Sequence, residues 1–334
     1  MRRLKAEWEK QEAILLALPH ADTDWQPYLK EARETFLGII KAILPHQKVL
    51  LCIDDKDSEG LEFVQNHLDS AQNLTIVRHP LNDTWARDFG PISIEENGAI
   101  KMLDFGFNGW GLKYPSNFDN QITRRLFADK ILPNLHTKDL ILEGGSIDSD
   151  GEGTLLTTAQ CLLESNRNPT LTKEMLESRL KLELGAQRIL WLHAGYLAGD
   201  DTDSHVDTLA RFLNPSTIAY IACEDREDEH YEALARMQEE LKSFRTKEGK
   251  PYNLIPLPLP CIYHDGERLP ASYANFLLIN GGKLLLPTYN TPELDSLAIA
   301  RLSPYYEVVP IDCSILIRQH GSLHCVSMQL YALS

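Results

Sequence analysis

Short apolar runs alternate with amphipathic stretches along the whole chain, and this alternation is the strongest constraint on its fold. KVLLCI (48–53) and LTIVR (74–78) have the composition of strands, and apolar residues at helical spacing occupy the regions near 36–44 and 59–70. The order strand, strand, helix, strand recurs several times without clear sequence identity between the copies. A chain that alternates strands and helices in this way is typical of the α/β class.

The rest of the chain continues the same alternation. Apolar runs predict strands at AIKMLDF, DLILE, TLLTT, QRILWL, TIAYIA, NFLLI, KLLLP and YEVVPI. Helical spacing predicts helices near 119–131, 172–184, 228–245 and 292–302. The proline-rich segment IPLPLPCIYHDGERLP (255–270) predicts a long irregular loop near a functional rim. No Gly/Ser-rich or Pro-rich linker divides the sequence, so we expect one domain over residues 1–334.

Composition excludes several classes of protein. Hydrophobic residues make up 43% and charged residues 24%, as in soluble globular proteins, and no apolar run approaches the ~18 residues of a membrane helix. The net charge of −15, without a Lys/Arg-rich run, argues against nucleic-acid binding and is compatible with a small cationic substrate. The N-terminus imitates a signal peptide, but Glu7, Glu9 and Glu12 interrupt it, so we expect a cytoplasmic protein.

The cysteines are dispersed, without a CxxC pair or close His/Cys spacing. This pattern favours a reducing compartment over a disulfide scaffold, and it argues against a structural zinc site. The six positions are Cys52, Cys161, Cys223, Cys261, Cys313 and Cys325.

Two segments concentrate polar residues after predicted strands. NDTWARDFGP (82–91) closes with glycine and proline, which predicts a polar loop; it is equally a turn with an Asp83–Arg87 or Arg87–Asp88 surface pair. In LILEGGSID (140–148) an apolar strand ends in Glu143, and two glycines then permit close backbone approach. That carboxylate either faces a site or lies in a solvated turn.

The segment GDDTDSHVDTLARF (199–212) is the most informative internal stretch. His205 and Asp207 stand two residues apart, and VDTLARF alternates as a strand does, so we expect both side chains on one face. The preceding loop adds three acids, at 200, 201 and 203. Acids this dense bind a cation, as in a calcium site or with a charged substrate, or they lie in solvent.

Cys325 lies nine residues before the end of the chain, in SLHCVSMQLYALS. In the short apolar strand that this segment predicts, a cysteine is by default a small buried hydrophobe. His324 would point to the opposite strand face, which makes it a poor activating base. If Cys325 is a nucleophile, its partners come from elsewhere in the chain.

Together these segments supply a cysteine, a histidine near a carboxylate, and further carboxylates in loops. The set suits attack on a positively charged planar carbon. A guanidinium presents five N–H donors in a rigid fork, which carboxylates match in bidentate fashion. Two carboxylates on opposite edges would hold it while a thiolate approaches the central carbon.

The sequence resembles the agmatine deiminase family, a branch of the guanidine-modifying pentein superfamily that is related to the bacterial peptidylarginine deiminases. The resemblance covers most of the chain through five ordered blocks: EWEKQEAILLALP, NDTWARDFGP, ILEGGSIDSDGEGT, GDDTDSHVD and HGSLHCVS. It implies a five-bladed α/β propeller of repeated strand–strand–helix–strand units. It also implies deimination of agmatine in putrescine and polyamine biosynthesis, without a metal or organic cofactor. The assembly that we consider for this protein is a homodimer.

The resemblance assigns chemical roles to five residues. Cys325 matches the nucleophile that becomes an amidino-cysteine, and His205 matches the general acid/base. Asp88 and Asp207 match the carboxylates that bind the guanidinium, and Glu143 matches the acid that orients the histidine.

Three further residues match substrate-binding positions of the family: Asp201, Trp85 and Asp83. The chain also departs from the family pattern without removing a chemical group from this set. His320 and Ser322 stand where glycines are usual before the cysteine block, and Ser204 where glycine is usual before the histidine. Elsewhere Asp148–Ser149 replaces histidine–valine, and Leu16 replaces tryptophan.

Other functions remain open from the residues alone. The Asp/His cluster could hold a metal that activates water, which would leave Cys325 unexplained. A non-catalytic amine-binding protein would tolerate the loss of Cys325. Within the superfamily, peptidylarginine deiminase is the nearest rival, although it usually brings extra domains. Free-arginine deimination would need a cationic clamp for the α-carboxylate, for which Arg87 is the candidate.

Overall fold

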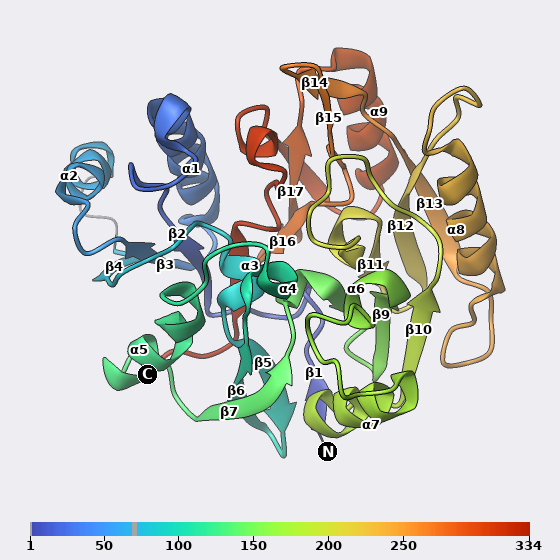
Figure 1. Cartoon of the computed structure of the whole chain (residues 1–334), viewed down its shortest axis with the longest axis horizontal. Helices are drawn as coiled ribbons and strands as arrows, with labels where there is room; N and C mark the ends of the chain where they lie inside the picture. The colour runs from blue at the N-terminus through green and yellow to red at the C-terminus, as the bar shows by residue number, and fades with distance from the viewer. Residues whose placement is uncertain (1, 69–71) are drawn as a thin grey trace.

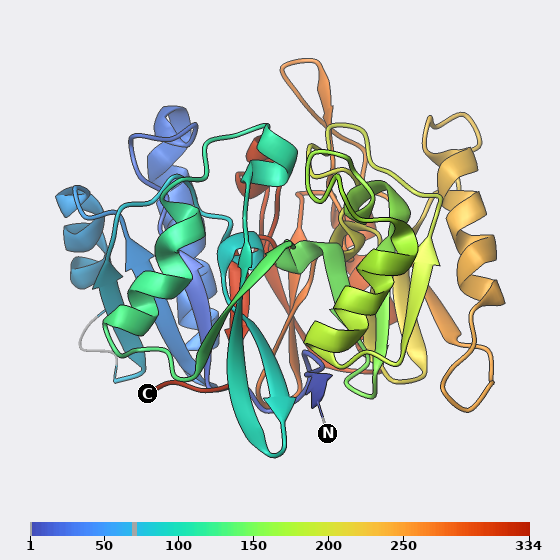
Figure 2. The same ribbon diagram turned by 60° about the horizontal axis from the view of Figure 1, so that its bottom comes forward.

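The computed structural model describes residues 2–68 and 72–334. Helices and strands alternate in the order expected, so the α/β class is confirmed. Figure 1 and Figure 2 show the longer helices around the outside of the molecule and the strands nearer its centre, with α3 and α4 in the middle of the first view. No helix within the described ranges is long and apolar enough to span a membrane.

Five of the sheets formed by the described residues share one plan. In four of them an antiparallel strand pair comes first, and a helical connection then leads to a strand parallel to the second of the pair; in the fifth, one strand of the pair comes from the C-terminal end of the chain. This is the strand–strand–helix–strand unit expected from the sequence. The three sheets of the second half are β8–β9–β10 (Ile147–Ser149, Thr154–Thr158, Arg188–Leu192), β11–β12–β13 (Ala210–Asn214, Thr217–Ala222, Asn253–Pro258) and β16–β17–β18 (Leu277–Ile279, Lys283–Thr288, Glu307–Asp312).

The other two sheets have four strands each, and one of them joins the two ends of the chain. The C-terminal strand β19 pairs antiparallel with β2, next to β3 and β4. These sheets are β19–β2–β3–β4 (Ser327–Leu330, Ala13–Ala17, Lys48–Ile53, Leu74–Arg78) and β1–β5–β6–β7 (Arg2–Leu4, Ile92–Glu96, Ala99–Gly106, Leu135–Ile141). A separate hairpin is formed by β14–β15 (Ile262–His264, Glu267–Leu269).

The helices that connect parallel strands bury an apolar stripe against their sheets. In α1, for example, Phe36, Ile39, Ile40 and Ile43 are fully buried at three- and four-residue spacing. The helices are α1 (Leu29–Ile43), α2 (Ser58–His67), α5 (Ile122–Ala128), α6 (Ala159–Leu162), α7 (Lys173–Leu184), α8 (Tyr231–Ser243) and α9 (Pro292–Leu302). Shorter helical turns are α3 (Ala86–Phe89), α4 (Gly109–Leu112), η1 (Gln26–Tyr28), η2 (Asp119–Gln121), η3 (Gly144–Ser146), η4 (Val206–Thr208) and η5 (Leu316–Gln319).

Two sequence predictions about local structure were wrong. The segment 255–270 is not irregular, because it contributes to β13 and to the β14–β15 hairpin. The segment 82–91 is not only a loop, because residues 86–89 form the helical turn α3. The helical stretch predicted near 119–131 is confirmed, as η2 followed directly by α5. The helix predicted near 59–70 ends at His67, and residues 69 and 70 lie outside the described residues.

The strand predicted around His205 and Asp207 was also wrong. Both residues lie at η4, which precedes β11, so their proximity is not the one-face spacing of a strand. Cys325 lies in a turn formed by residues 323–326, immediately before β19, and not in a strand. Successive side chains alternate between two faces in a strand but not in a turn, so His324 is not forced to point away from the side of Cys325.

Candidate active site

A cavity of about 160 Å³ lies where several sheets and loops converge. Residues far apart in the sequence line it, and they include four of the five to which the resemblance assigns a chemical role; the fifth, Glu143, is not among them. Its acidic lining residues are Asp24, Asp83, Asp88, Asp200, Asp201 and Asp207, and the others include Trp85, Trp110, Tyr114, His205, His320 and Cys325. No lysine or arginine occurs among its described lining residues. Such a lining favours a positively charged ligand.

Asn275 holds the turn that carries Cys325. Its side-chain oxygen accepts hydrogen bonds from the backbone N–H groups of His324 (2.8 Å) and Cys325 (3.4 Å). Its Nδ2 donates to Cys325 Sγ at 3.2 Å. The thiol is 7% exposed, which leaves it accessible from the cavity. Burial raises the pKa of Cys325 well above its usual value, and the nearby charges of Asp207 and Asp88 raise it further, so the thiol is neutral without a ligand.

Asp207 lies beside the thiol and is tied into a buried chain of charges. Its Oδ2 is 3.9 Å from Cys325 Sγ and 2.7 Å from Nδ1 of His324. The other ring nitrogen of His324 lies 2.9 Å from Oε2 of Glu7, which also pairs with the buried Arg211. Burial raises the pKa of Asp207, but the hydrogen bond and charge of His324 outweigh it, and the net shift is downward. Its second oxygen, Oδ1, is buried without a hydrogen-bond partner.

Asp88 is positioned by groups from two other segments. Its Oδ1 accepts from the backbone N–H of Gly145 at 2.9 Å, and its Oδ2 accepts from Nε1 of Trp110 at 3.0 Å. Trp110 has a left-handed backbone (φ 55°), a conformation that costs about 1–3 kcal/mol and that recurs at functional sites. Burial raises the pKa of Asp88 well above its usual value, and the charges of Asp207 and Glu143 add to this effect. A bound cation would relieve that cost.

Close approach to the site requires glycine at position 145. A Cβ atom there would lie 2.5 Å from Nδ1 of His205, 3.0 Å from Oδ1 of Asp88 and 3.1 Å from Oδ2 of Asp207. The glycine pair that was noticed in the sequence therefore allows the backbone to pass directly behind three functional side chains.

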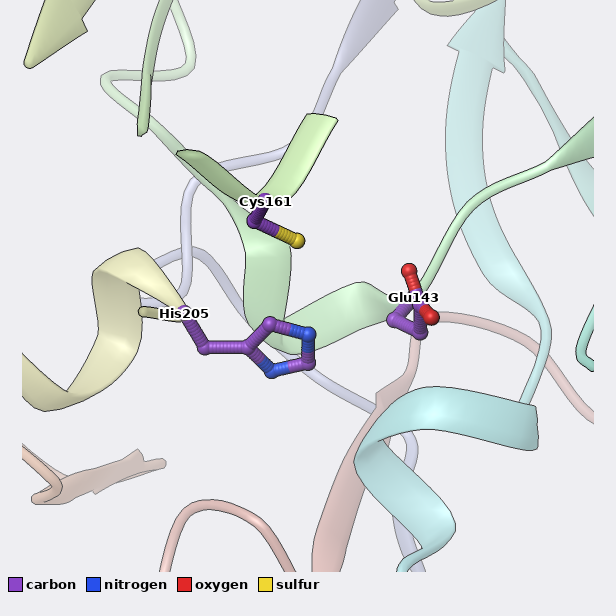
Figure 3. A group of neighbouring side chains, drawn as sticks. All are labelled: Glu143, Cys161 and His205. Carbon is purple, nitrogen blue, oxygen red and sulfur yellow. The ribbon is translucent and has the colours of Figure 1, made fainter. Parts of the chain in front are cut away.

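His205 is buried between the cavity and a polar cluster. Its Nδ1 lies 3.7 Å from Oδ1 of Asp88, and its Nε2 is buried without a hydrogen-bond partner. Figure 3 shows the other ring edge turned toward Glu143 and Cys161, and ligand atoms of these three residues lie within 4.8 Å of one another. Burial lowers the pKa of His205 to about 3, so the imidazole is neutral in the free protein.

Glu143 does not hydrogen-bond to His205. Both of its carboxylate oxygens accept from Nε of Arg167 at 2.9 Å, and neither side chain is exposed. Arg167 also donates to Asp203 (2.7 Å) and to the carbonyl of Thr202 (2.9 Å) in the loop before His205. Glu143 and Arg167 therefore fix this loop as well as the polar surroundings of the imidazole.

The three residues expected to bind the rest of the substrate line the cavity. Asp83 accepts from the indole N–H groups of Trp25 (2.8 Å) and Trp85 (3.0 Å), which sets the orientation of both rings. Asp201 accepts from the hydroxyl of Tyr114 at 2.8 Å. Burial raises the pKa of Asp83.

Arg87 does not line the cavity. It is buried, and its Nε donates to the carbonyl of His324 at 3.3 Å. The Asp83–Arg87 and Arg87–Asp88 surface pairs are therefore not formed. The clamp for an α-carboxylate that we considered at Arg87 is not available.

Four residues that shape the site were missed from the sequence: Asn275, Trp110, Arg167 and His324. The first three lie outside the segments that the sequence analysis singled out, and no motif marks them in a single sequence. His324 was set aside because a strand was expected.

The chain belongs to the Porphyromonas-type peptidyl-arginine deiminase family, whose model matches residues 3–330. Among curated relatives, an agmatine deiminase of Pseudomonas aeruginosa is 32% identical, and the alignment covers 98% of this chain and 95% of the relative. The structure is similar to that of a cysteine-to-serine variant of C. jejuni agmatine deiminase with substrate bound (42% identity, TM-score 0.92, 100% and 97% of the two chains).

A more distant similarity concerns the fold alone. An inosamine-phosphate amidinotransferase of Streptomyces griseus superimposes with a TM-score of 0.52 at 12% identity, over 100% of this chain and 98% of the other. This similarity extends over both chains at low identity, and it agrees with the α/β fold described above.

Proposed function

We propose that the protein hydrolyses agmatine to N-carbamoylputrescine and ammonia, through a covalent amidino-cysteine on Cys325. The observation that carries this proposal is the buried, unpartnered Oδ1 of Asp207, in a cavity with a second buried carboxylate, Asp88, and the thiol. A buried acceptor without a donor costs about 1–3 kcal/mol, and a guanidinium N–H would satisfy it. The agmatine deiminases among the relatives support the same substrate.

Asp88 and Asp207 bind the guanidinium in this proposal, and the cation then changes the state of the thiol. Without a ligand the two carboxylates and burial keep Cys325 protonated. A guanidinium between the carboxylates offsets their charge, so the reactive thiolate forms only in the complex. The neutral imidazole of His205 is available to accept the thiol proton.

The reaction then proceeds in two halves. The Cys325 thiolate attacks the guanidinium carbon, the bond to one terminal nitrogen breaks, and His205 returns its proton to the departing ammonia. His205 next takes a proton from water, which adds to the amidino carbon. Collapse of that adduct breaks the C–S bond and releases the ureido product, and the proton returns to the thiolate. Glu143 acts through its fixed position behind the imidazole.

The charge of the cavity lining distinguishes agmatine from free arginine as a substrate. Free arginine carries an α-carboxylate, and the described lining offers no lysine or arginine to pair with it. Agmatine ends in an ammonium group instead, for which Asp83, Asp201 and Trp85 line the cavity. Peptidyl-arginine lacks the α-carboxylate and remains the second candidate, as the name of the matching family indicates.

The test is ammonia release from agmatine, free arginine and a peptidyl-arginine side by side, by wild-type protein and by Cys325→Ser. We expect agmatine to be preferred and Cys325→Ser to bind agmatine but to lose more than about 10⁴-fold in turnover, because losing a positioned acid/base alone costs ~10²–10⁴-fold. Activity retained by Cys325→Ser, or an adduct on another cysteine, would overturn the mechanism. Loss of activity in EDTA with recovery on adding metal would favour the metallohydrolase.

We also propose the finer features that the resemblance implies. The five similar sheets are arranged as the blades of a propeller in a single catalytic domain, and the cavity lies at its axis. The enzyme acts in the cytoplasm without a metal or organic cofactor. Size-exclusion chromatography with light scattering tests the proposed homodimer.

A further inference from the structure

The cluster behind the catalytic cavity has the composition of a site for a soft divalent cation. Within the described residues, one group of histidine, cysteine and acidic side chains places its ligand atoms within 4.8 Å of one another: Glu143, Cys161 and His205. They come from three segments, at η3, α6 and η4, and converge on one space (Figure 3). Thiolate, imidazole and carboxylate are the ligands that zinc takes in proteins.

An independent observation points to a ligand in this space. His205 is 1% exposed, and its Nε2 has no hydrogen-bond partner. The ring nitrogen farther from the Cβ is the one turned toward Cys161 and Glu143 in Figure 3. A buried imidazole nitrogen without a donor or acceptor is costly, and a metal ion would use its lone pair.

The spacing and the charge of the cluster both permit an ion. Ligand atoms around tetrahedral zinc lie about 3.5 Å apart, so side-chain rotations need to close the group by about 1 Å. Arg167 contacts both oxygens of Glu143, but each oxygen keeps a further lone pair. With Cys161 ionised, three anions (Glu143, Cys161 and Asp203) face two cations, because Arg167 pairs with Glu143 and Asp203 and Lys113 pairs with Asp203. One negative charge is left over, which favours a cation in this space.

We propose that Glu143, Cys161 and His205 bind a zinc-like divalent cation that inhibits the enzyme reversibly by occupying the imidazole. Binding at this cluster stands apart from the catalytic role of His205, whereas inhibition rests on the proposed function. Cys161 takes no part in the proposed reaction. A metal ion that depends on the Cys161 thiol is therefore bound at this cluster and not at the nucleophile Cys325. Binding would displace the thiol proton, as metal–thiolate formation requires.

Metal binding is tested with Co²⁺ as a spectroscopic probe, on protein in which Cys223, Cys261 and Cys325 are replaced by serine. This background removes the nucleophile and the two cysteines that are not buried. A thiolate-to-cobalt absorption band with one equivalent bound supports the site, and its absence overturns the proposal. Adding Cys161→Ser should abolish the band and weaken Zn²⁺ binding at least about tenfold, since even loss of an outer contact costs 10–100-fold. Unchanged binding would also overturn it.

Inhibition is measured separately, as ammonia release from agmatine against free Zn²⁺ concentration. We expect Cys161→Ser or Cys161→Ala to need at least about tenfold more Zn²⁺ than the wild type, and EDTA to restore activity. Equal inhibition of wild type and variants would place the inhibitory ion elsewhere and refute the regulatory part. If agmatine is not turned over at all, the cobalt band still decides the binding site.

Discussion

Replacing Gly145 with alanine tests whether the approach of the backbone to the site sets its activity. The added Cβ would lie 2.5 Å from Nδ1 of His205, whereas ordinary contacts begin at 3.4 Å. The two atoms must therefore separate by about 0.9 Å. Contacts of 3.0 Å to Asp88 and 3.1 Å to Asp207 oppose any shift of the new methyl toward the carboxylates. Most of the displacement falls on the imidazole.

A displacement of this size has a defined cost. A misplacement of about 1 Å in a catalytic group lowers rate by about 10²-fold, so we expect the kcat of Gly145→Ala to fall by that factor. Overpacking costs about 1–3 kcal/mol of stability, which a chain of this size should tolerate with a lowered but cooperative melting transition. Agmatine binding should weaken less than turnover, because Asp88 keeps its indole donor from Trp110.

The assay is steady-state ammonia release, with thermal unfolding measured on the same samples. Gly38→Ala is the matched control, because it makes the same change in α1 at an exposed position where a Cβ meets nothing within 4 Å. It should leave kcat unchanged and raise stability by up to about 1 kcal/mol through helix propensity. A folded Gly145→Ala protein with kcat within threefold of wild type would refute the argument.

Three further predictions follow from other contacts. In Gly321→Ala the new Cβ would lie 2.1 Å from the ring of Trp85, so we expect the KM for agmatine to rise more than kcat falls in the same ammonia assay. Arg167→Met leaves the buried carboxylate of Glu143 unpaired, and denaturant unfolding should show a loss of about 3–5 kcal/mol. For Glu7, burial raises the pKa but its cationic neighbours outweigh this and lower it from 4.5 to about 2. Its stabilisation is complete above pH 4.5 and is lost as pH falls toward 2, so unfolding measurements of Glu7→Gln should show a shallower decline over that window.

The strands with clear apolar runs could be predicted because burial on both faces leaves little choice of residue. KVLLCI, for example, is buried from its second residue onward and became β3 within the predicted bounds. The proline-rich strand β13 could not be predicted in the same way. Pro256 and Pro258 lack the N–H that a central strand needs, but β13 lies at the edge of its sheet, where proline is tolerated.

The candidate site was predicted in composition but not in local geometry. The segment before His205 forms a turn where a strand was predicted, and Asp200 explains why. Its carboxylate accepts from the hydroxyl of Thr202 (2.6 Å) and from the backbone N–H of Ser204 (2.6 Å). These side-chain bonds stabilise a turn in place of the strand that alternation favours. Arg167, which lies on a different segment and gives no local signal, adds a further hydrogen bond to this turn through the carbonyl of Thr202 (2.9 Å).

Two departures from the family pattern have a backbone explanation. Ser204 and His320 both adopt left-handed conformations, with φ of 65° and 64°. Glycine adopts these angles without strain, which accounts for its usual presence at these positions in the family that the sequence resembles. Here the strain is offset by side-chain contacts: Oγ of Ser204 donates to Gln160 at 3.2 Å, and the imidazole of His320 lies 2.7 Å from the carbonyl of Gly199.

The position of Cys325 near the end of the chain follows from how the first and last segments meet. β19 pairs with β2, so the turn that carries the thiol is fixed only when the C-terminal strand has docked on the N-terminal sheet. The next residue back, His324, connects Asp207 to Glu7, a residue of the N-terminal segment. The charge balance beside the thiol therefore depends on contacts between the two ends of the sequence. Contacts between residues so far apart in sequence cost loop-closure entropy, so the arrangement of thiol and carboxylates depends on the long-range packing of the whole fold and not on any local segment.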